Sequence, residues 1–414
     1  MGIYQRVRKL FGDPGLFFAV LGLTLFGVVM IYSAGQVERQ GALEANLWRT
    51  QLVWLGLSLM VFAVVLRIPV RWLEWVAPVA YFGGLATLLV TLTIGTGAGT
   101  AAGTKSWLAV GPIRVQPAQF VNVATILMLA KVMGGWREAP PTIWALWQPV
   151  VIAAVPMLLV LAQPDLGTAM VFGGVLLATL YWGGAPLGAI FLLLSPVVAL
   201  FLAFMGWIYS VYMILLIVFL YLYRVRMSEA VAVLVANLAS GTIAVGLWNS
   251  LEQYQRNRIL AFMNPETDPL GAGYHSIQSQ IAIGSGGVTG KGFLEGTQKR
   301  LSFLPEQWTD FIYAVIGEEL GFVGAAGVLA AYFYILWRLA SIAERLGDPF
   351  AGIVVFGIFG AWFTHILVNV GMTVGVMPIT GIPLPFLSYG GSFLLATFIG
   401  LGVAQRVAIE GGRV

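Results

Sequence analysis

The feature that most constrains this chain is a series of long apolar runs separated by short polar connections. A helix needs about 20 apolar residues to cross about 30 Å of hydrocarbon, where every backbone hydrogen bond must be made internally. Only 10% of the residues are charged, whereas a soluble protein has about 25%. The chain is therefore predicted to be an all-α polytopic membrane protein, one integral domain over residues 1–414. About twelve spans are expected, near 15–33, 48–66, 74–94, 116–134, 147–162, 166–183, 187–205, 207–223, 229–247, 311–337, 351–374 and 388–409.

The positions of the basic residues predict the orientation of these spans, because loops rich in Lys and Arg stay in the cytoplasm. One side collects Arg6, Arg8, Lys9, Arg67, Arg71, Lys131, Arg137, Arg224, Arg226, Arg338, Arg345, Arg406 and Arg413. The short loops of the other side hold Arg39, Arg49, Lys105 and Arg114. Both termini are therefore expected to be cytoplasmic. The loops 95–115 and 375–387 and the large loop 248–309 are expected to be extracytoplasmic.

Several polar residues lie where the hydrocarbon makes them costly, so each is a functional candidate. Glu318 and Glu319 lie about two turns into the predicted 311–337 span, unless that helix starts outside the membrane and the pair is interfacial. Asp165 follows a proline and opens a span, which indicates a helix cap, with substrate contact as the alternative. His365 and Asn369 share a helical face and suggest a polar bond between helices. The chain has no cysteine and only two histidines, so thiolate and His-rich metal centres are excluded.

The large loop contains the most promising carboxylate. Asp268 lies between Pro265 and Pro269, which restrict the backbone beside it; the alternative is an ordinary solvated turn. Further on, the glycine-rich run 284–292 fails to match a phosphate-binding P-loop, because Lys291 is followed by glycine and not by Ser or Thr. A backbone nest that binds a lipid diphosphate, with Lys291 as the counter-charge, is still possible on physical grounds.

Several of these motifs resemble the SEDS family (shape, elongation, division and sporulation). The resemblance extends over residues 103–409 and lies in Gln163–Thr168, Asn264–Gly287, Gly296–Gln298, Phe303–Phe311, Gly317–Gly321 and Pro383–Ser392. Tyr274-His275 and the Gly-Thr-Gln at 296–298 resemble the elongation type more than the division type. Family members usually have ten spans, so 207–223 and 229–247 would form an extra helical hairpin near 207–247.

The resemblance implies a peptidoglycan glycosyltransferase of the bacterial cytoplasmic membrane. It would polymerise lipid II on the outer face during cell elongation, with a class B penicillin-binding protein as its partner and with Asp268 as the catalytic residue. Membrane lipids would surround it, and no nucleic acid is implied. This chain departs from the family at Gln119 and Asn122, where a Glu and a Lys are usual. The usual pair either holds helices together, in which case a neutral pair can substitute, or contacts substrate or metal.

Glycan polymerisation joins a sugar hydroxyl to an anomeric carbon whose leaving group is a lipid diphosphate. The site therefore needs a base for the hydroxyl and cations for the diphosphate. Asp268 is the predicted base. Lys291, Lys105 and Arg258 are candidates for binding the diphosphate, together with a divalent cation, Mg²⁺ or Mn²⁺, on unknown oxygen ligands. Trp107 either stacks on a sugar or anchors the interface, and Glu306 and Asp310 either contact substrate or brace the loop. The remaining predicted substrate-binding residues are Gln119, Asn122, Asp165, His275, Gln278, Ser279 and Ser388.

Two other functions fit the same sequence. A flippase or transporter of lipid-linked precursor would also need many spans with polar groups inside them, although its site should lie near the membrane midplane and not in an outer loop. A non-catalytic scaffold that activates the penicillin-binding partner would need only the architecture.

Overall fold

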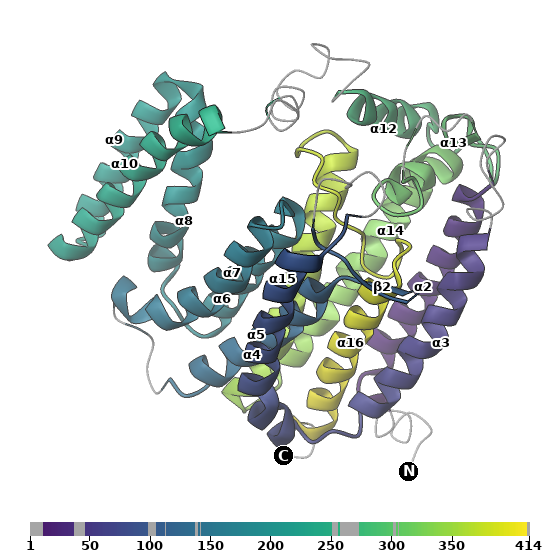
Figure 1. Cartoon of the computed structure of the whole chain (residues 1–414), viewed down its shortest axis with the longest axis horizontal. Helices are drawn as coiled ribbons and strands as arrows, with labels where there is room; N and C mark the ends of the chain where they lie inside the picture. Colours follow the sequence, from purple (N-terminus) through teal and green to yellow (C-terminus); the bar gives the residue numbers. More distant parts are fainter. Residues whose placement is uncertain are drawn as a thin grey trace.

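The computed structural model describes residues 11–36, 46–97, 105–111, 113–136, 142–250, 273–300 and 306–411, with the single residues 140, 256 and 304. Within these residues the protein is a bundle of long helices (Figure 1). All twelve predicted runs are helical. They correspond to α2 Pro14–Ala34, α3 Leu47–Val65, α4 Val70–Ile94, α5 Pro117–Met133, α6 Trp147–Leu161, α7 Leu166–Trp182, α8 Leu187–Leu202, α9 Trp207–Leu222, α10 Met227–Ser250, α14 Ile312–Glu344, α15 Pro349–Thr373 and α16 Gly391–Gly411.

Nine helical stretches in the described part of the chain are long and apolar enough to cross a membrane, which makes this an integral membrane protein. The helices α6 and α8 reach this length together with their adjoining 3-10 turns, as Ile143–Leu161 and Leu187–Met205. The helices α5, α7 and α9 fall short of it, at 17, 17 and 16 residues. At 1.5 Å per residue such a helix spans about 25 Å, less than the usual hydrocarbon thickness. Twelve helices are therefore confirmed, whereas twelve membrane crossings stay a prediction.

Aspartate caps begin several of these helices. Asp13 Oδ1 accepts the Leu16 N–H at 2.9 Å, and Asp348 Oδ1 accepts the Phe350 N–H at 3.2 Å. A proline follows each aspartate as the first helical residue, where its missing N–H costs nothing. The order Asp-Pro therefore sets the starts of α2 and α15.

The helix α15 forms the centre of the bundle. It packs against α5, α7, α14 and α16, and most of its residues are buried. The start of α2 and the end of α16 lie together, because Gln405 Nε2 donates to Asp13 O at 2.9 Å. This agrees with termini on one side of a membrane, while the side itself stays a prediction.

The predicted hairpin near 207–247 is present as α9 and α10, which group with α8 beside the main bundle (Figure 1); that it is additional to the family's usual spans stays a prediction. A buried polar contact joins the three helices. Asn237 Nδ2 on α10 donates to Ser195 Oγ on α8 at 2.8 Å, and Tyr212 on α9 donates to Asn237 Oδ1 at 3.2 Å. Such bonds hold helices together in lipid.

Three smaller features differ from the predicted all-α fold with open loops. An antiparallel pair, β1 Leu108–Val110 and β2 Ile113–Val115, lies within the predicted loop 95–115. The predicted loop 248–309 begins later than expected, because α10 continues to Ser250, and it contains α12 Tyr274–Ser285 and α13 Thr297–Arg300. Short 3-10 turns, η3 Ile143–Leu146 and η4 Ala203–Met205, precede α6 and follow α8.

Candidate functional site

Asp165 caps α7, as the sequence predicts. Its Oδ1 accepts the Thr168 N–H at 3.0 Å, which satisfies one of the free donors at the helix start. Its Oδ2 accepts from Gln116 Nε2 at 2.9 Å and from the Thr168 hydroxyl at 3.0 Å. Burial raises the pKa of Asp165, and the hydrogen bonds from Thr168, Ser106 and Gln116 oppose that rise. The carboxylate therefore joins the starts of α5 and α7.

Gln119 and Asn122 line a small cavity between α5, α15 and α16, which His365 also lines. Gln119 Nε2 donates to Gln116 Oε1 at 3.2 Å, which connects it to the Asp165 cluster. Asn122 Nδ2 is buried and has no hydrogen-bond partner among the described residues. Gln119 and Asn122 are therefore not hydrogen-bonded to each other, and neither alternative given for this pair is decided.

Lys105 and Trp107 flank Ser106, whose side chain lies beside that of Asp165. The backbone N–H of Lys105 donates to Gln163 O at 3.3 Å, and its side chain is exposed. Trp107 is half-buried and pairs with Thr96 in an antiparallel bridge. Both are near the Asp165 turn, and their contact with substrate stays a prediction.

A second cluster holds the segment 306–311 against the segment 380–390. Ser388 Oγ donates to Thr309 O at 2.6 Å, and Asn369 Nδ2 donates to Asp310 O at 2.9 Å and to Ile382 O at 2.6 Å. The Glu306 carbonyl accepts the N–H groups of Thr309 and Asp310 at 3.0 and 3.1 Å. The Glu306 and Asp310 backbones therefore form a tight, braced turn.

The expected interhelical role of His365 and Asn369 is wrong. His365 Nδ1 lies 3.1 Å from Pro383 O, and Asn369 binds backbone carbonyls of the same two segments. Both side chains point from α15 to a loop, because the buried backbone carbonyl groups of a loop need hydrogen-bond donors. The sequence pattern identified a shared helical face but not its partner.

The helix α12 carries three predicted site residues. Ser279 is buried and its hydroxyl donates to Thr373 O, at the end of α15, at 2.8 Å. The His275 ring lies 6.5 Å from the Phe311 ring, so α12 faces the braced turn. Gln278 is half-buried, and its Oε1 has no partner among the described residues. These contacts place α12 beside the second cluster.

The helix α14 is interrupted at Gly321, which has a φ of 64°. At the break, the turn 286–292 inserts its backbone. The N–H groups of Lys291 and Gly292 donate to Glu318 O and Glu319 O, both at 3.0 Å. The N–H groups of Phe322 and Val323 donate to Gly287 O and Val288 O at 2.9 and 3.1 Å. The turn therefore satisfies the backbone groups that the break sets free.

This inserted turn requires glycine at close approaches. A Cβ at Gly286 would lie 2.0 Å from Gly317 O, and one at Gly290 would lie 2.1 Å from Glu319 O. The N–H groups of 291 and 292 are used within the protein, so in this conformation they are not available to the proposed diphosphate nest.

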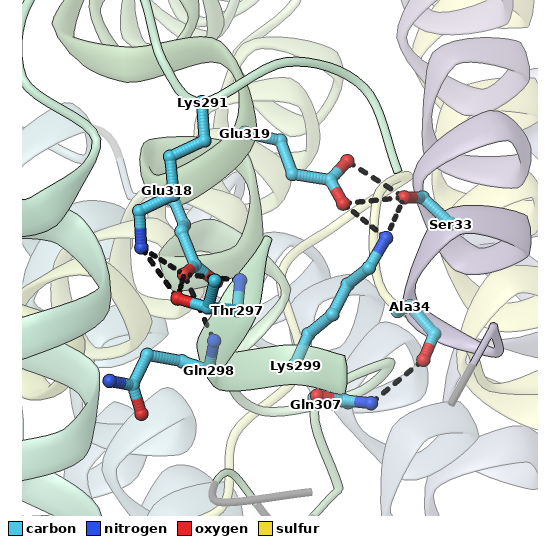
Figure 2. Close-up of polar contacts among 9 residues, drawn as sticks. All are labelled: Ser33, Ala34, Lys291, Thr297, Gln298, Lys299, Gln307, Glu318 and Glu319. Atoms are coloured by element: carbon cyan, nitrogen blue, oxygen red, sulfur yellow. Dashed lines mark hydrogen bonds and ion pairs between the residues drawn. The ribbon is translucent and has the colours of Figure 1, made fainter. Parts of the chain in front are cut away.

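Glu318 and Glu319 are fully buried, and each is paired with a lysine (Figure 2). Glu318 Oε1 accepts from Lys291 Nζ at 2.7 Å and from the N–H groups of Thr297 and Gln298 at 2.8 and 3.0 Å, which caps α13. Glu319 pairs with Lys299, which is also fully buried. The sequence predicts Glu318 and Glu319 either inside the span or at the interface, and neither alternative includes the lysine partners. Lys291 as a diphosphate ligand stays a prediction, and its ammonium is shared with Glu318.

Asp268 and Arg258 lie outside the described residues, so their predicted roles rest on the sequence alone. Sequence reasoning missed Lys299, Gln307 and Gln116. A signal for Lys299 was present, because two carboxylates in an apolar helix require two cations and the nearby loop supplies Lys291 and Lys299. Among the described residues, no group of three or more His, Asp or Glu is placed to hold a metal ion. We therefore derive no step through a metal, and the divalent cation stays a prediction.

The helices are apolar, and at one end they bring together helix-capping carboxylates, amides and buried ion pairs. This arrangement defines a polytopic membrane protein with a polar site beside α12 and α13. The chain belongs to the family described as cell cycle protein, whose model is named for FtsW, RodA and SpoVE and matches residues 14–212 and 205–411. The two matched segments overlap at residues 205–212, across the start of α9.

Named relatives extend over nearly the whole chain. Peptidoglycan glycosyltransferase RodA of Treponema pallidum (strain Nichols) is 35% identical over 428 residues, covering 95% of this chain and 97% of that protein. Peptidoglycan glycosyltransferase MrdB of Escherichia coli (strain K12) is 33% identical over 397 residues, covering 95% and 93%. A solved structure described as "structural coordination of polymerization and crosslinking by a peptidoglycan synthase complex" is 27% identical, with a TM-score of 0.71 over 97% of this chain and 99% of that one.

Proposed function

We propose that this protein is a peptidoglycan glycosyltransferase that polymerises lipid II during cell elongation. The observation that carries the proposal is the family match, joined to relatives of that name over 95% of the chain. Tyr274-His275 and the Gly-Thr-Gln at 296–298 support the elongation type. The polymerising site would lie at the α12–α13 end, on the outer face of the bacterial cytoplasmic membrane.

In the proposed reaction, a sugar hydroxyl of one glycan substrate attacks the anomeric carbon of a second glycan substrate, which carries the lipid diphosphate. A new carbon–oxygen bond forms, the bond to the lipid diphosphate breaks, and the diphosphate leaves with the electron pair. The hydroxyl proton passes to Asp268. Lys105, Arg258 and Lys291 would offset the charge of the diphosphate.

A penicillin-binding protein of class B is the proposed partner. The solved relative is described as a complex that coordinates polymerisation with crosslinking, and a transpeptidase supplies the crosslinking. The partner would receive the glycan as it leaves the α12–α13 end.

The test uses the purified full-length protein in detergent with lipid II and Mg²⁺ or Mn²⁺, and glycan chains are separated on a gel. We expect a ladder of chains, because polymerisation needs no membrane potential and no second compartment. A flippase would leave lipid II unchanged in detergent. A scaffold would give chains only when a partner with its own glycosyltransferase is added.

A further inference from the structure

Lys299 is fully buried, and so is its partner Glu319. Lys299 Nζ also donates to Ser33 Oγ at 2.5 Å, and that hydroxyl lies 2.7 Å from each oxygen of Glu319 (Figure 2). Ser33 is the next-to-last residue of α2. The three side chains therefore join three parts of the chain: the segment around α13, the interrupted helix α14 and the end of α2.

A buried ion pair contributes little net stability, because removing both charges from water offsets their attraction. Its distinctive contribution is geometry, since the ammonium, the carboxylate and the hydroxyl are satisfied together in one arrangement. The side chain of Lys299 is 0% exposed, so its ammonium does not reach a lipid diphosphate. Lys299 is not a catalytic residue.

A second contact ties the braced turn to the same helix end. Gln307 Nε2 donates to Ala34 O at 2.8 Å, and Gln307 is buried. Ala34 is the last residue of α2, where helix carbonyls lack partners within the helix. Residues 299 and 307 are thus both bound to the last two residues of α2. Gln307 lies within the braced turn that contains Glu306 and Asp310, so this turn and α13 are bound to the same helix end.

We propose that Lys299 is a positioning residue for glycan polymerisation: with Glu319 and Ser33, it ties α13 to the end of α2, the same helix end to which Gln307 ties the braced turn with Glu306 and Asp310. This inference rests on the proposed function. The neighbouring pair, Lys291 with Glu318, cannot replace it, because that pair holds α13 to α14 and does not reach α2.

The test separates stability from positioning. Lys299→Met alone leaves Glu319 buried without its cation, and its melting temperature should fall. The double variant Lys299→Met with Glu319→Met removes both charges, and its melting temperature should recover toward the wild-type value. Its kcat for lipid II should nevertheless stay about 10-fold to 100-fold low with KM unchanged, because small misplacements cost rate and not binding. Lys131→Met is the matched control, because among the described residues Lys131 donates to the Glu74 carbonyl, away from α12 and α13, and its kcat should be unchanged.

Ser33→Ala serves as a second variant if the double variant does not fold. It keeps the ion pair, so its melting temperature should be close to that of the wild type, while its kcat falls several-fold. A wild-type kcat in the folded double variant or in Ser33→Ala would overturn the inference, as would a change confined to KM. A wild-type protein that makes no chains would overturn the proposed function first and this inference with it.

Discussion

An Asp268→Asn variant is expected to polymerise lipid II about 100-fold more slowly than the wild type or worse, because a positioned general base contributes about 10²–10⁴-fold. Asparagine has nearly the size of aspartate and can still bond a sugar hydroxyl, but it cannot take up the proton. KM for lipid II should therefore change little while kcat collapses. Steady-state rates of chain formation in detergent measure both constants.

Asp348→Asn is the matched control for this change. Asp348 is exposed and caps α15 at the opposite end of the bundle from α12 and α13, and asparagine caps a helix as well as aspartate does. Its kcat should equal that of the wild type. Equal rates for the Asp268 and Asp348 variants would remove Asp268 from the reaction.

A Gly286→Ala variant should lose stability and activity together. Its Cβ would lie 2.0 Å from Gly317 O, and a backbone carbonyl moves only if α14 or the inserted turn moves. Overpacking costs about 1–3 kcal/mol, and we expect the upper part of that range. Displacement of the turn would also break the bonds that fill the gap in α14. Thermal unfolding in detergent, followed by the lipid II assay, measures both effects.

Gly284→Ala tests whether that result comes from the close approach. Gly284 lies two residues earlier on α12, and a Cβ there meets nothing within 4 Å. Alanine in a helix is up to about 1 kcal/mol more favourable than glycine, so this variant should be as stable as the wild type or more stable. If both alanine variants unfold at the wild-type temperature, the inserted turn is not as tightly packed as the structure indicates.

The helices could be predicted from the sequence because each long apolar run has one satisfactory conformation in lipid. The start of α7 could be predicted because Asp165 stands at its cap. The ends of α5 and α7 were predicted to within one residue, at 116–134 and 166–183 against 117–133 and 166–182, but hydropathy does not decide whether helices this short cross the membrane. Whether a short helix crosses the membrane depends on its neighbours.

The break in α14 could not be predicted from hydropathy. Gly321 lies within an apolar stretch that reads as a single helix, and what opens it is the backbone of residues 286–292, about thirty positions earlier. Hydropathy contains no information about such pairing. The run that contains Gly286 and Gly290 was interpreted as a phosphate nest. The conformational freedom of glycine suits a phosphate nest and a close backbone contact alike.

The polar residues of the site were easier to find than their partners. Asp165 forms the predicted helix cap, and this could be predicted because a cap is a local contact. Asn369, Ser388 and Lys299 bind groups that are far away in sequence, so their partners depend on how the helices pack. Lys299 was missed because a lysine in a polar loop looks solvated until Glu319 and Ser33 surround it.

Everything proposed for this chain depends on the α12–α13 end facing away from the cytoplasm. The protein has no cysteine, so a Val288→Cys variant carries a single thiol, at a side chain that is 67% exposed. Gly347→Cys, in the turn between α14 and α15, reports on the opposite end. A membrane-impermeant maleimide should label Val288→Cys in intact cells and Gly347→Cys only after the cells are opened. The reverse pattern would place the polar site in the cytoplasm and contradict polymerisation on the outer face.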